Sequence, residues 1–471
     1  MAGGSYVGLD IGSNQIKVAE LRRSGNQVQV VALGVAPTPP EAYAQSDVVD
    51  AQLLGQAVKA LLKQSGIGTK DVVSSVSGQS AVVVRVIEVP QMDSKELAET
   101  MKWEVERHVP FANSEVIMDY APIDRPEGYA EGQNMDVLLA VAQQDFVDRH
   151  IEMLNAAGLK PKYIDVEPLA LGRTLLDMDA DQSPIGHTVA IINIGASNTE
   201  IGIFRDRLLT FPRTLPLAGD NLTRAIAATL GVDQATAEKY KIEYGEVLLD
   251  QLSAPVPDFG GGAAFGAPGF QDFSAPAPNP FGSPTDPFAS PDQSATASPS
   301  GRMPFDFATP GESLEAPSGA PLGFEEPLEA APAPVDNLPA SVSASDPARD
   351  AFKAQVFAAI APVLGELVQE IRRSLDYYRG RAGDVPIHEL LLVGGTSNLK
   401  NLAQFLELEL GVPARVPDTF RNIQLTAKSM SPTYAHELSP LFPISIGLGA
   451  RDLISDPSAN KAKSKAPKKK K

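Results

Sequence analysis

The sequence predicts a two-lobed α/β protein. Its 471 residues are too many for one ordinary domain and enough for two hydrophobic cores. A strand–turn–strand opening occurs twice, around Asp10 and around Asn193, and helical patterns follow each copy. We therefore expect two related halves, a first lobe over residues 1–180 and a second lobe over residues 181–455.

The first lobe opens with three predicted strands and continues with helices and further strands. Residues 24–26 (Ser-Gly-Asn) supply a hairpin turn between the second and third strands. Apolar residues from Val48 to Leu62 recur at helical spacing, and Asp93 or Ser94 caps a helix that stops before Pro110. The elements expected here are strands at Tyr6–Leu9, Gln15–Leu21, Gln27–Val35, Val72–Val76, Val82–Val89, Asp136–Ala142 and Tyr163–Val166, and helices at residues 48–62, 93–109 and Gln144–Ala157.

The second lobe repeats the three-stranded opening and then becomes mostly helical. Alternating and helical apolar periods predict its elements in the same way. They are strands at Thr188–Ile194, Glu200–Phe204, Leu208–Pro212 and Glu389–Val393, and helices at Gly219–Leu230, Gln234–Tyr244, Ala348–Tyr378, Asn398–Leu410 and Ile444–Leu453.

Residues 251–346 break this globular pattern. They hold 18 of the 40 prolines and 9 of the 18 phenylalanines, with twelve acidic residues and one base, Arg302. No period of 2 or 3.6 residues survives, so the segment buries too little surface to offset its ordering entropy. We expect a disordered insertion in the second lobe. Its phenylalanines are either short recognition motifs for a partner or part of a spacer without a role of its own.

Charge and composition restrict the location and the partners. The formal net charge of −18 argues against a nucleic-acid partner. Residues 456–471 form a lysine-rich tail that we expect to be disordered, either solvated or in contact with anionic lipid at about 1 kcal/mol per charge. We find no cysteine, no signal peptide and no run of about 18 apolar residues. We expect a cytosolic protein.

Three glycine turns form the candidate functional site. Each follows an apolar run and supplies glycines with small hydroxyl or amide residues, so backbone N–H groups can approach a phosphate. A nucleoside triphosphate with its metal needs such donors, a cation on the phosphates, and carboxylates around the metal's water shell. The turns lie at Gly8–Lys17, Asn193–Thr199 and Leu391–Ser397.

The first turn offers all three kinds of group. Gly12, Ser13 and Asn14 allow close backbone approach to a phosphate. Asp10 ends the first strand, where it can hold magnesium-bound water. Lys17 returns on the next strand across from Asp10 and supplies the cation. An ordinary hairpin with a surface lysine would give the same pattern.

The second turn provides phosphate-facing groups from the opposite half of the chain. They are Gly195, Ala196, Ser197 and Thr199, preceded by Asn193. Glu167 stands between the halves, at the start of the helix that links them. Its carboxylate either orients a water toward the terminal phosphate or stabilises its own helix as an N-terminal acid.

The remaining candidates concern the base and the ribose. Glu238 and Lys241 lie three apart on one helical face, either for the ribose and base or as a solvated ion pair worth about 0.3–0.5 kcal/mol. The third turn adds Gly394, Gly395, Thr396 and Ser397. Its two glycines leave no side chain to obstruct an adenine ring. The chain has no Walker P-loop pattern, so the expected site is a cleft between lobes.

These segments together resemble the actin-like ATPase superfamily and, within it, the PilM family of type IV pilus assembly proteins, which is related to FtsA. The likeness spans residues 1–250 and 350–455. Residues Glu370–Tyr378 (Glu-Ile-Arg-Arg-Ser-Leu-Asp-Tyr-Tyr) are the stretch most similar to PilM. The two phosphate motifs and the adenosine motif of the family are matched by Gly8–Lys17, Ile192–Thr199 and Leu391–Ser397.

The resemblance implies a fold, cofactors and a partner. The fold is the actin-like, ribonuclease H-like one, with a subdomain 1C within about residues 38–165. The cofactors are ATP and Mg²⁺, with Glu167 in the position that serves hydrolysis in FtsA and MreB. The implied partners are the cytoplasmic N-terminal peptide of PilN and the pilus motor ATPases. We therefore expect peripheral association with the inner membrane through PilN, and a role in twitching motility.

Two departures and two other protein classes accompany this interpretation. The acidic, Pro-rich insertion at residues 251–346 enlarges a region that is short in the PilM family. Asn193 stands where the family usually has Asp and brings no negative charge, so we expect slow or absent ATP hydrolysis. A filament-forming division or shape protein, like FtsA or MreB, should carry an amphipathic membrane helix, and the lysine tail has no apolar face. A phosphotransferase such as a sugar or acetate kinase needs a catalytic acid and a substrate-binding lobe, for which we find no clear candidate.

Overall fold

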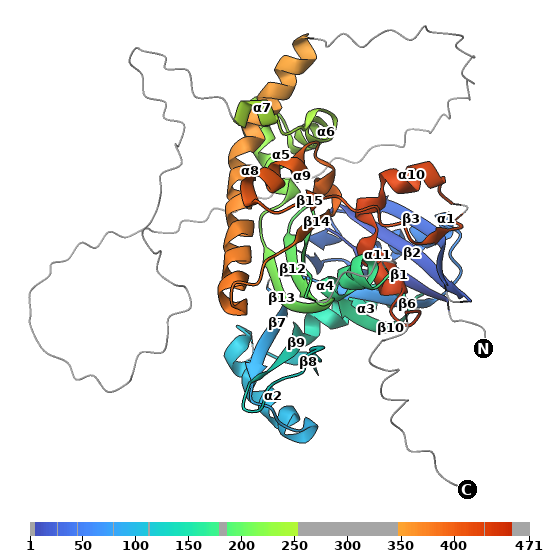
Figure 1. Ribbon diagram of the computed structural model, residues 1–471. Helices are drawn as coiled ribbons and strands as arrows, with labels where there is room; N and C mark the ends of the chain where they lie inside the picture. The colour runs from blue at the N-terminus through green and yellow to red at the C-terminus, as the bar shows by residue number, and fades with distance from the viewer. Residues whose placement is uncertain are drawn as a thin grey trace, which may run out of the picture. The chain divides into compact units, whose positions relative to one another are not determined.

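The computed structural model describes residues 5–252 and 347–454, apart from positions 26, 45, 79, 112–113, 179–185 and 428. The predicted insertion, from residue 253 onward, and the predicted lysine-rich tail lie outside the described residues. Within the described body, two mixed sheets each carry their own helices (Figure 1).

The first sheet has six strands in the order β10-β6-β1-β2-β3-β16. Val7 and Leu9 of β1 pack toward α1 (Ala51–Gln64) and α3 (Gln144–Ala156), and Gly8 between them faces the C-terminal segment. Because both faces are covered, the strand reads as an apolar run. The strands are β1 (Ser5–Ile11), β2 (Gln15–Ser24), β3 (Gln27–Pro37), β6 (Asp71–Val76), β10 (Lys160–Val166) and β16 (Gln424–Leu425).

The second sheet has five strands in the order β13-β12-β11-β14-β15 and repeats the plan of the first. β11 pairs antiparallel with β12 and parallel with β14, as β1 does with β2 and β6. The opening that the sequence predicts twice is therefore present in both sheets. The strands are β11 (Thr188–Ile194), β12 (Thr199–Arg205), β13 (Leu208–Leu215), β14 (Glu389–Val393) and β15 (Ala414–Arg415).

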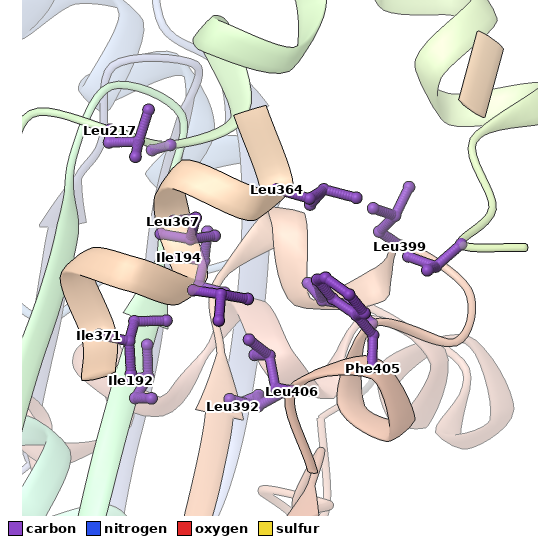
Figure 2. Close-up of a cluster of buried hydrophobic side chains, with 14 of the residues drawn as sticks. Ile192, Ile194, Leu217, Leu364, Leu367, Ile371, Leu392, Leu399, Phe405 and Leu406 are labelled. Carbon is purple, nitrogen blue, oxygen red and sulfur yellow. The ribbon is translucent and has the colours of Figure 1, made fainter. Parts of the chain in front are cut away.

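A helix of 36 residues, α8 (Pro347–Ala382), packs on the second sheet. Figure 2 shows its Ile371 beside Ile192 of β11, in the cluster that also holds residues of β14 and α9 (Leu402–Leu410). Among the described helices, α8 alone is long and apolar enough to cross a membrane. Its buried residues, among them Leu364, Leu367 and Ile371, belong to this cluster. The remaining helices of the lobe are α5 (Gly219–Leu230), α6 (Gln234–Tyr244) and α7 (Leu249–Leu252).

Residues 370–378, the stretch on which the expected family resemblance depends most, are the part of α8 that meets β13. Arg213 of β13 donates to the Ser374 hydroxyl at 2.9 Å and pairs with Glu370 at 3.0 Å. Ile371 and Tyr378 are buried in the same cluster. The motif therefore fixes the helix on the sheet.

A smaller sheet, in the order β7-β9-β8, packs with α2 (Ser94–His108). Leu97, Met101 and Val105 recur every four residues along α2 and are buried against it. Its strands are β7 (Val82–Val89), β8 (Val116–Pro122) and β9 (Met135–Gln143). The range predicted to include subdomain 1C, about residues 38–165, covers this unit together with α1 and α3, which belong to the core of the first sheet.

The C-terminal segment returns to the first sheet. β16 pairs in parallel with β3, while α10 (Pro432–Glu437) and α11 (Pro443–Gly449) pack against residues of β2 and β3. The predicted second lobe, residues 181–455, includes this segment, whose contacts here are with the first sheet. A two-residue strand and two short helices carry no local signal of the sheet that they will join.

Two short helices cross between the sheets. α4 (Glu167–Gly172), continued by the π-helical turn η1 (Arg173–Asp177), packs on α11. A Cβ atom at Gly447 would lie 1.9 Å from the Ala170 carbonyl oxygen, so the two backbones touch. Leu171 and Ile444 belong to a cluster with residues of both sheets, which makes this crossing the connection between the lobes.

The elements that the sequence did not predict are short or irregular. They are β4 (Tyr43–Ala44), β5 (Asp47–Val48), β8, β15, β16, α7, α10 and η3 (Ser439–Leu441). Most have two to six residues, too few to establish a period. α9 begins at Leu402 rather than Asn398, because the 3₁₀ turn η2 (Gly395–Asn398) occupies the third glycine turn.

Candidate functional site

A cavity of about 400 Å³ lies where β1, β11 and β14 end, and all three glycine turns line it. Its wall therefore combines residues of both sheets. The predicted site residues that line it are Asp10, Gly12, Ser13, Asn14, Lys17, Glu167, Asn193, Gly195, Ala196, Ser197, Glu238, Lys241, Gly394, Gly395 and Thr396.

Two predicted site residues do not line the cavity. Thr199 is fully buried, and its hydroxyl donates to the Leu217 carbonyl at 2.6 Å. The Ser397 hydroxyl donates to the Gly394 carbonyl at 2.7 Å and closes its own turn. Both hydroxyls satisfy backbone carbonyls, a role that composition alone does not distinguish from ligand binding.

The first turn joins β1 and β2, whose register places Asp10 directly opposite Lys17. The Lys17 Nζ lies 2.9 Å from Asp10 Oδ2, and both side chains are nearly buried. The Gly12 N–H donates to the Gln15 carbonyl and closes the turn, so Gly12 provides close approach rather than a free donor. The turn therefore presents the cavity with a cation already paired to a carboxylate.

The second turn joins β11 and β12 and is attached to the start of α5. The Gly195 N–H donates to the Asn198 carbonyl, and the Gly219 and Asp220 amides donate to the Gly195 and Ala196 carbonyls. The Ser197 hydroxyl donates to Asp220 Oδ2 at 3.0 Å. The turn is thus held directly before a helix N-terminus, where partial positive charge favours an anion.

The third turn packs directly against the second and is hydrogen-bonded to it. Gly394 has φ +88°, and a Cβ atom there would lie 2.5 Å from both Asn193 Oδ1 and the Ile194 carbonyl oxygen. The Thr396 hydroxyl donates to the Gly195 carbonyl at 2.8 Å. Gly394 is therefore required for contact with β11, whereas we had expected it to leave room for an adenine ring. Gly395 remains on the cavity wall.

Three buried carboxylates meet in the cavity: Asp10, Glu167 and Glu200. Burial and the neighbouring Asp10 raise the pKa of Glu167, which also hydrogen-bonds with Glu200 and Ser77. Burial, together with Glu167, raises the pKa of Glu200 well above its usual range. The pair therefore keeps a proton to higher pH than a free carboxyl group does.

Asn193 and Glu200 form the counterpart of Asp10 and Lys17. They are directly opposite each other in the β11–β12 register, and Asn193 Nδ2 lies 3.5 Å from Glu200 Oε2. The second hairpin thus carries an acid on its second strand, where the first hairpin carries a lysine. Asn193 carries no charge, but Glu200 supplies a carboxyl group on this side of the cavity.

Glu238 and Lys241 of α6 are not the solvated pair that their spacing also allowed. Their charged atoms are 2.7 Å apart, and the side chain of Lys241 is only 13% exposed. Lys241 Nζ also contacts the Thr223 hydroxyl at 2.9 Å, and that hydroxyl donates to Glu238. This network attaches α6 to α5 at the cavity wall.

The cavity residues that escaped the sequence prediction include Tyr43, Ser46, Ser77, Asn198 and Glu200. Glu200 could have been found from the sequence, because it follows Asn193 by seven residues, as Lys17 follows Asp10. Tyr43 and Ser46 lie in or beside the two-residue strands β4 and β5, and Ser77 follows β6, where no repeated spacing singles it out. Burial and the nearby Glu167 raise the pKa of the Tyr43 hydroxyl, which keeps it a neutral donor beside the carboxylates.

Sequence comparison matches the chain to two family models. The model described as type IV pilus assembly protein PilM matches residues 8–247, and that of cell division protein FtsA matches residues 190–439. FtsA of Bacillus subtilis (strain 168) is 24% identical over 270 residues, which are 53% of this chain and 60% of that protein. FtsA of Streptococcus pneumoniae serotype 2 (strain D39) is 25% identical over 264 residues, 52% and 56% of the two chains. The chain thus spans less than two thirds of these curated relatives.

Structural comparison adds a match over nearly the whole length. The solved structure titled PilM-PilN type IV pilus biogenesis complex aligns with 95% of this chain and 98% of the other. The TM-score is 0.65 and the sequence identity is 26%. The expected fold is therefore confirmed. The chain belongs to the type IV pilus assembly protein PilM family and has the two-lobed fold of the actin-like ATPases.

Proposed function

We propose that this protein is a nucleotide-binding scaffold of type IV pilus assembly, and that ATP with Mg²⁺ occupies the cavity between its lobes. The convergence of three glycine turns, Lys17 and the Lys241 network on one cavity carries the proposal. Cations beside glycine turns suit phosphates, because the turns leave room for close approach and the lysines supply charge-assisted hydrogen bonds.

The residues present fit a magnesium nucleotide. Mg²⁺ keeps several waters and uses one or two carboxylates together with the phosphates. Asp10 and Glu200 face the cavity, while no group of three acidic or histidine side chains in the described chain forms a metal site by itself. The metal would therefore enter with the nucleotide, Asp10 would hold its water shell, and Lys17 would turn from Asp10 to the phosphates.

We infer that ATP hydrolysis is slow or absent. Glu167 is the candidate to orient an attacking water, because it lines the cavity beside the first turn. Its raised pKa and its hydrogen bond to Glu200 work against service as a free base. Nucleotide binding then acts by stabilising one arrangement of the lobes rather than by turnover.

The proposed partner is PilN. The solved relative that matches nearly the whole chain is a complex with PilN, which supports the same partner here. We propose that the protein binds the cytoplasmic N-terminal peptide of PilN and thereby associates peripherally with the inner membrane. Pilus motor ATPases are the proposed cytoplasmic partners, and twitching motility is the process served.

The alternative is an FtsA- or MreB-like filament, which the FtsA match over residues 190–439 favours. The two functions differ in a simple observable. A filament protein sediments at high speed with ATP above a critical concentration. A scaffold remains in the supernatant and binds the PilN peptide.

The nucleotide proposal is tested by calorimetry of ATP–Mg²⁺ binding to the wild type and to Lys17→Ala. We expect Lys17→Ala to lose at least about tenfold in affinity, because a hydrogen bond to a charged group contributes about 1.5–3 kcal/mol. Lys63→Ala, an exposed lysine in the last turn of α1, is the matched control and should bind as the wild type does. Equal affinity in both variants would reject the first turn as a phosphate site.

The partner proposal is tested by fluorescence anisotropy with a labelled peptide from the cytoplasmic N-terminus of PilN, with and without ATP. We expect saturable binding that ATP strengthens, and none to a scrambled peptide of the same composition. A scaffold without a nucleotide response would bind equally in both conditions. Failure to bind in either condition would remove PilN's N-terminus as the ligand.

A further inference from the structure

The β4–β5 hairpin is a part of the cavity that belongs to neither large sheet. It lies between β3 and α1 in the chain, and its Tyr43 and Ser46 line the cavity. Asn198 of the second turn donates from Nδ2 to the Ser46 hydroxyl oxygen at 2.9 Å. This hydrogen bond joins a residue of the first lobe to a residue of the second.

The hairpin is firmly attached to the first lobe. Arg149 of α3 pairs with Asp47 at 2.5 Å, and the Val49 and Asp50 amides donate to the Ala42 carbonyl. Tyr43 and Val48 are buried in the core of the first sheet. Because its base cannot shift freely, the bond to Asn198 fixes the distance between the hairpin and the second turn.

The backbone of Ser46 has a conformation that is uncommon for serine. Its φ of +64° lies in the left-handed region, which a serine adopts only when its surroundings hold it there. Gly78, with φ +143°, lies against it, and a Cβ atom at Gly78 would be 3.4 Å from the Ser46 Cβ. The hydroxyl accepts from Asn198, so its own proton remains for donation into the cavity that Ser46 lines.

We propose that the β4–β5 hairpin is a strap across the phosphate end of the cavity, and that Ser46 and Asn198 are positioning residues that hold the second phosphate turn to the first lobe and slow nucleotide release. The ligand is the phosphate chain of a nucleoside triphosphate, so the inference depends on the nucleotide binding proposed above. The strap acts on release because dissociation requires the second turn to separate from the first lobe.

The kinetic test follows release of a fluorescent ATP analogue by stopped flow. Ser46→Ala, Ser46→Gly and Asn198→Ala should each release it about fivefold faster, the effect of losing one hydrogen bond of about 1 kcal/mol. The glycine variant relieves the left-handed backbone and the alanine variant does not, so a shared effect assigns the role to the hydroxyl. Ser46→Ala combined with Asn198→Ala should be no faster than either alone. Asn134→Ala, an exposed residue of the β8–β9 loop, is the control.

A covalent test uses the absence of cysteine from the chain. Ser46→Cys combined with Asn198→Cys should form a disulfide on oxidation, and the crosslinked protein should retain bound analogue until it is reduced. Ser46→Cys combined with Asn134→Cys should remain uncrosslinked. Wild-type release rates in the single variants, or unchanged release from a protein crosslinked at 46 and 198, would overturn the strap. If the wild type does not bind ATP, the strap's role and the proposed function fall together.

Discussion

At the scale of the residue, the charge of the candidate site depends on which two side chains lie opposite each other in each hairpin. Asp10 faces Lys17 in the first hairpin, and Asn193 faces Glu200 in the second. One hairpin therefore holds an ion pair, while the other places its acid against Glu167. Lys17 in the first hairpin can attract an anionic ligand, whereas the carboxyl pair at the second hairpin stays protonated to a higher pH.

The raised pKa of Glu200 predicts that the stability of the protein depends on pH. The raised pKa of Glu200 means that the native state binds a proton that the unfolded state has released. The stability that it contributes is present below the unfolded pKa of about 4.3 and is lost as pH rises through the folded pKa. Glu200→Gln should therefore flatten the fall in unfolding free energy from about pH 4.5 upward. Urea denaturation at a series of pH values, without nucleotide or Mg²⁺, measures it.

Glu246→Gln is the control with the opposite sign. A hydrogen bond from Lys400 lowers the pKa of Glu246, so its stabilisation is present above the unfolded pKa and is lost as pH falls. The glutamine variant should lose stability at neutral pH and approach the wild type in acid. If Glu200→Gln ran parallel to the wild type over the whole range, the raised pKa of Glu200 would be wrong.

At the scale of the element, the crossing of α4 and α11 connects the two lobes, and its glycines allow the backbones to touch. Side chains at the same positions would separate the helices. The geometry of the cavity depends on this contact, because Glu167 begins α4 and Ile444 of α11 lines the cavity.

A pair of helical glycines tests the role of this crossing. Gly447→Ala places a Cβ atom 1.9 Å from the Ala170 carbonyl oxygen, and it should destabilise the protein by about 3 kcal/mol, the upper end for overpacking. Gly365→Ala in α8 meets no atom within 4 Å and should stabilise by about 0.5–1 kcal/mol. Thermal and urea unfolding compare the two. Equal effects would show that the helices separate without cost.

At the scale of the whole molecule, the described body contains both sheets, the small β7-β9-β8 sheet and the C-terminal segment that returns to the first sheet. The predicted insertion leaves this body after α7 and re-enters at α8. We still expect the body to fold without it, because the described residues already form extensive buried clusters in both lobes.

Replacing residues 253–346 by a flexible Gly–Ser linker of about ten residues tests this expectation. Shortening the connection lowers the entropy cost of loop closure by at most about 2 kcal/mol, so Tm should stay the same or rise slightly. Circular dichroism during heating measures Tm, and ATP calorimetry checks that the cavity is intact. Loss of a cooperative transition would mean that the segment contributes to a core.

The sequence by itself determined the features that depend on neighbours in the chain. The hairpin openings, the caps such as Asp93, and the opposition of Asp10 and Lys17 follow from local periods and turn residues. These were predicted because strand pairing through a short turn leaves one register.

Only the tertiary structure decided the contacts between distant segments. It placed β16 and α11 on the first sheet, set Glu200 against Glu167, and brought Ser46 to Asn198. Each of these depends on the relative position of two cores, and no period within either segment encodes that position. The chain therefore specifies its turns locally, whereas the cavity between them exists only after the lobes have packed through α4 and α11.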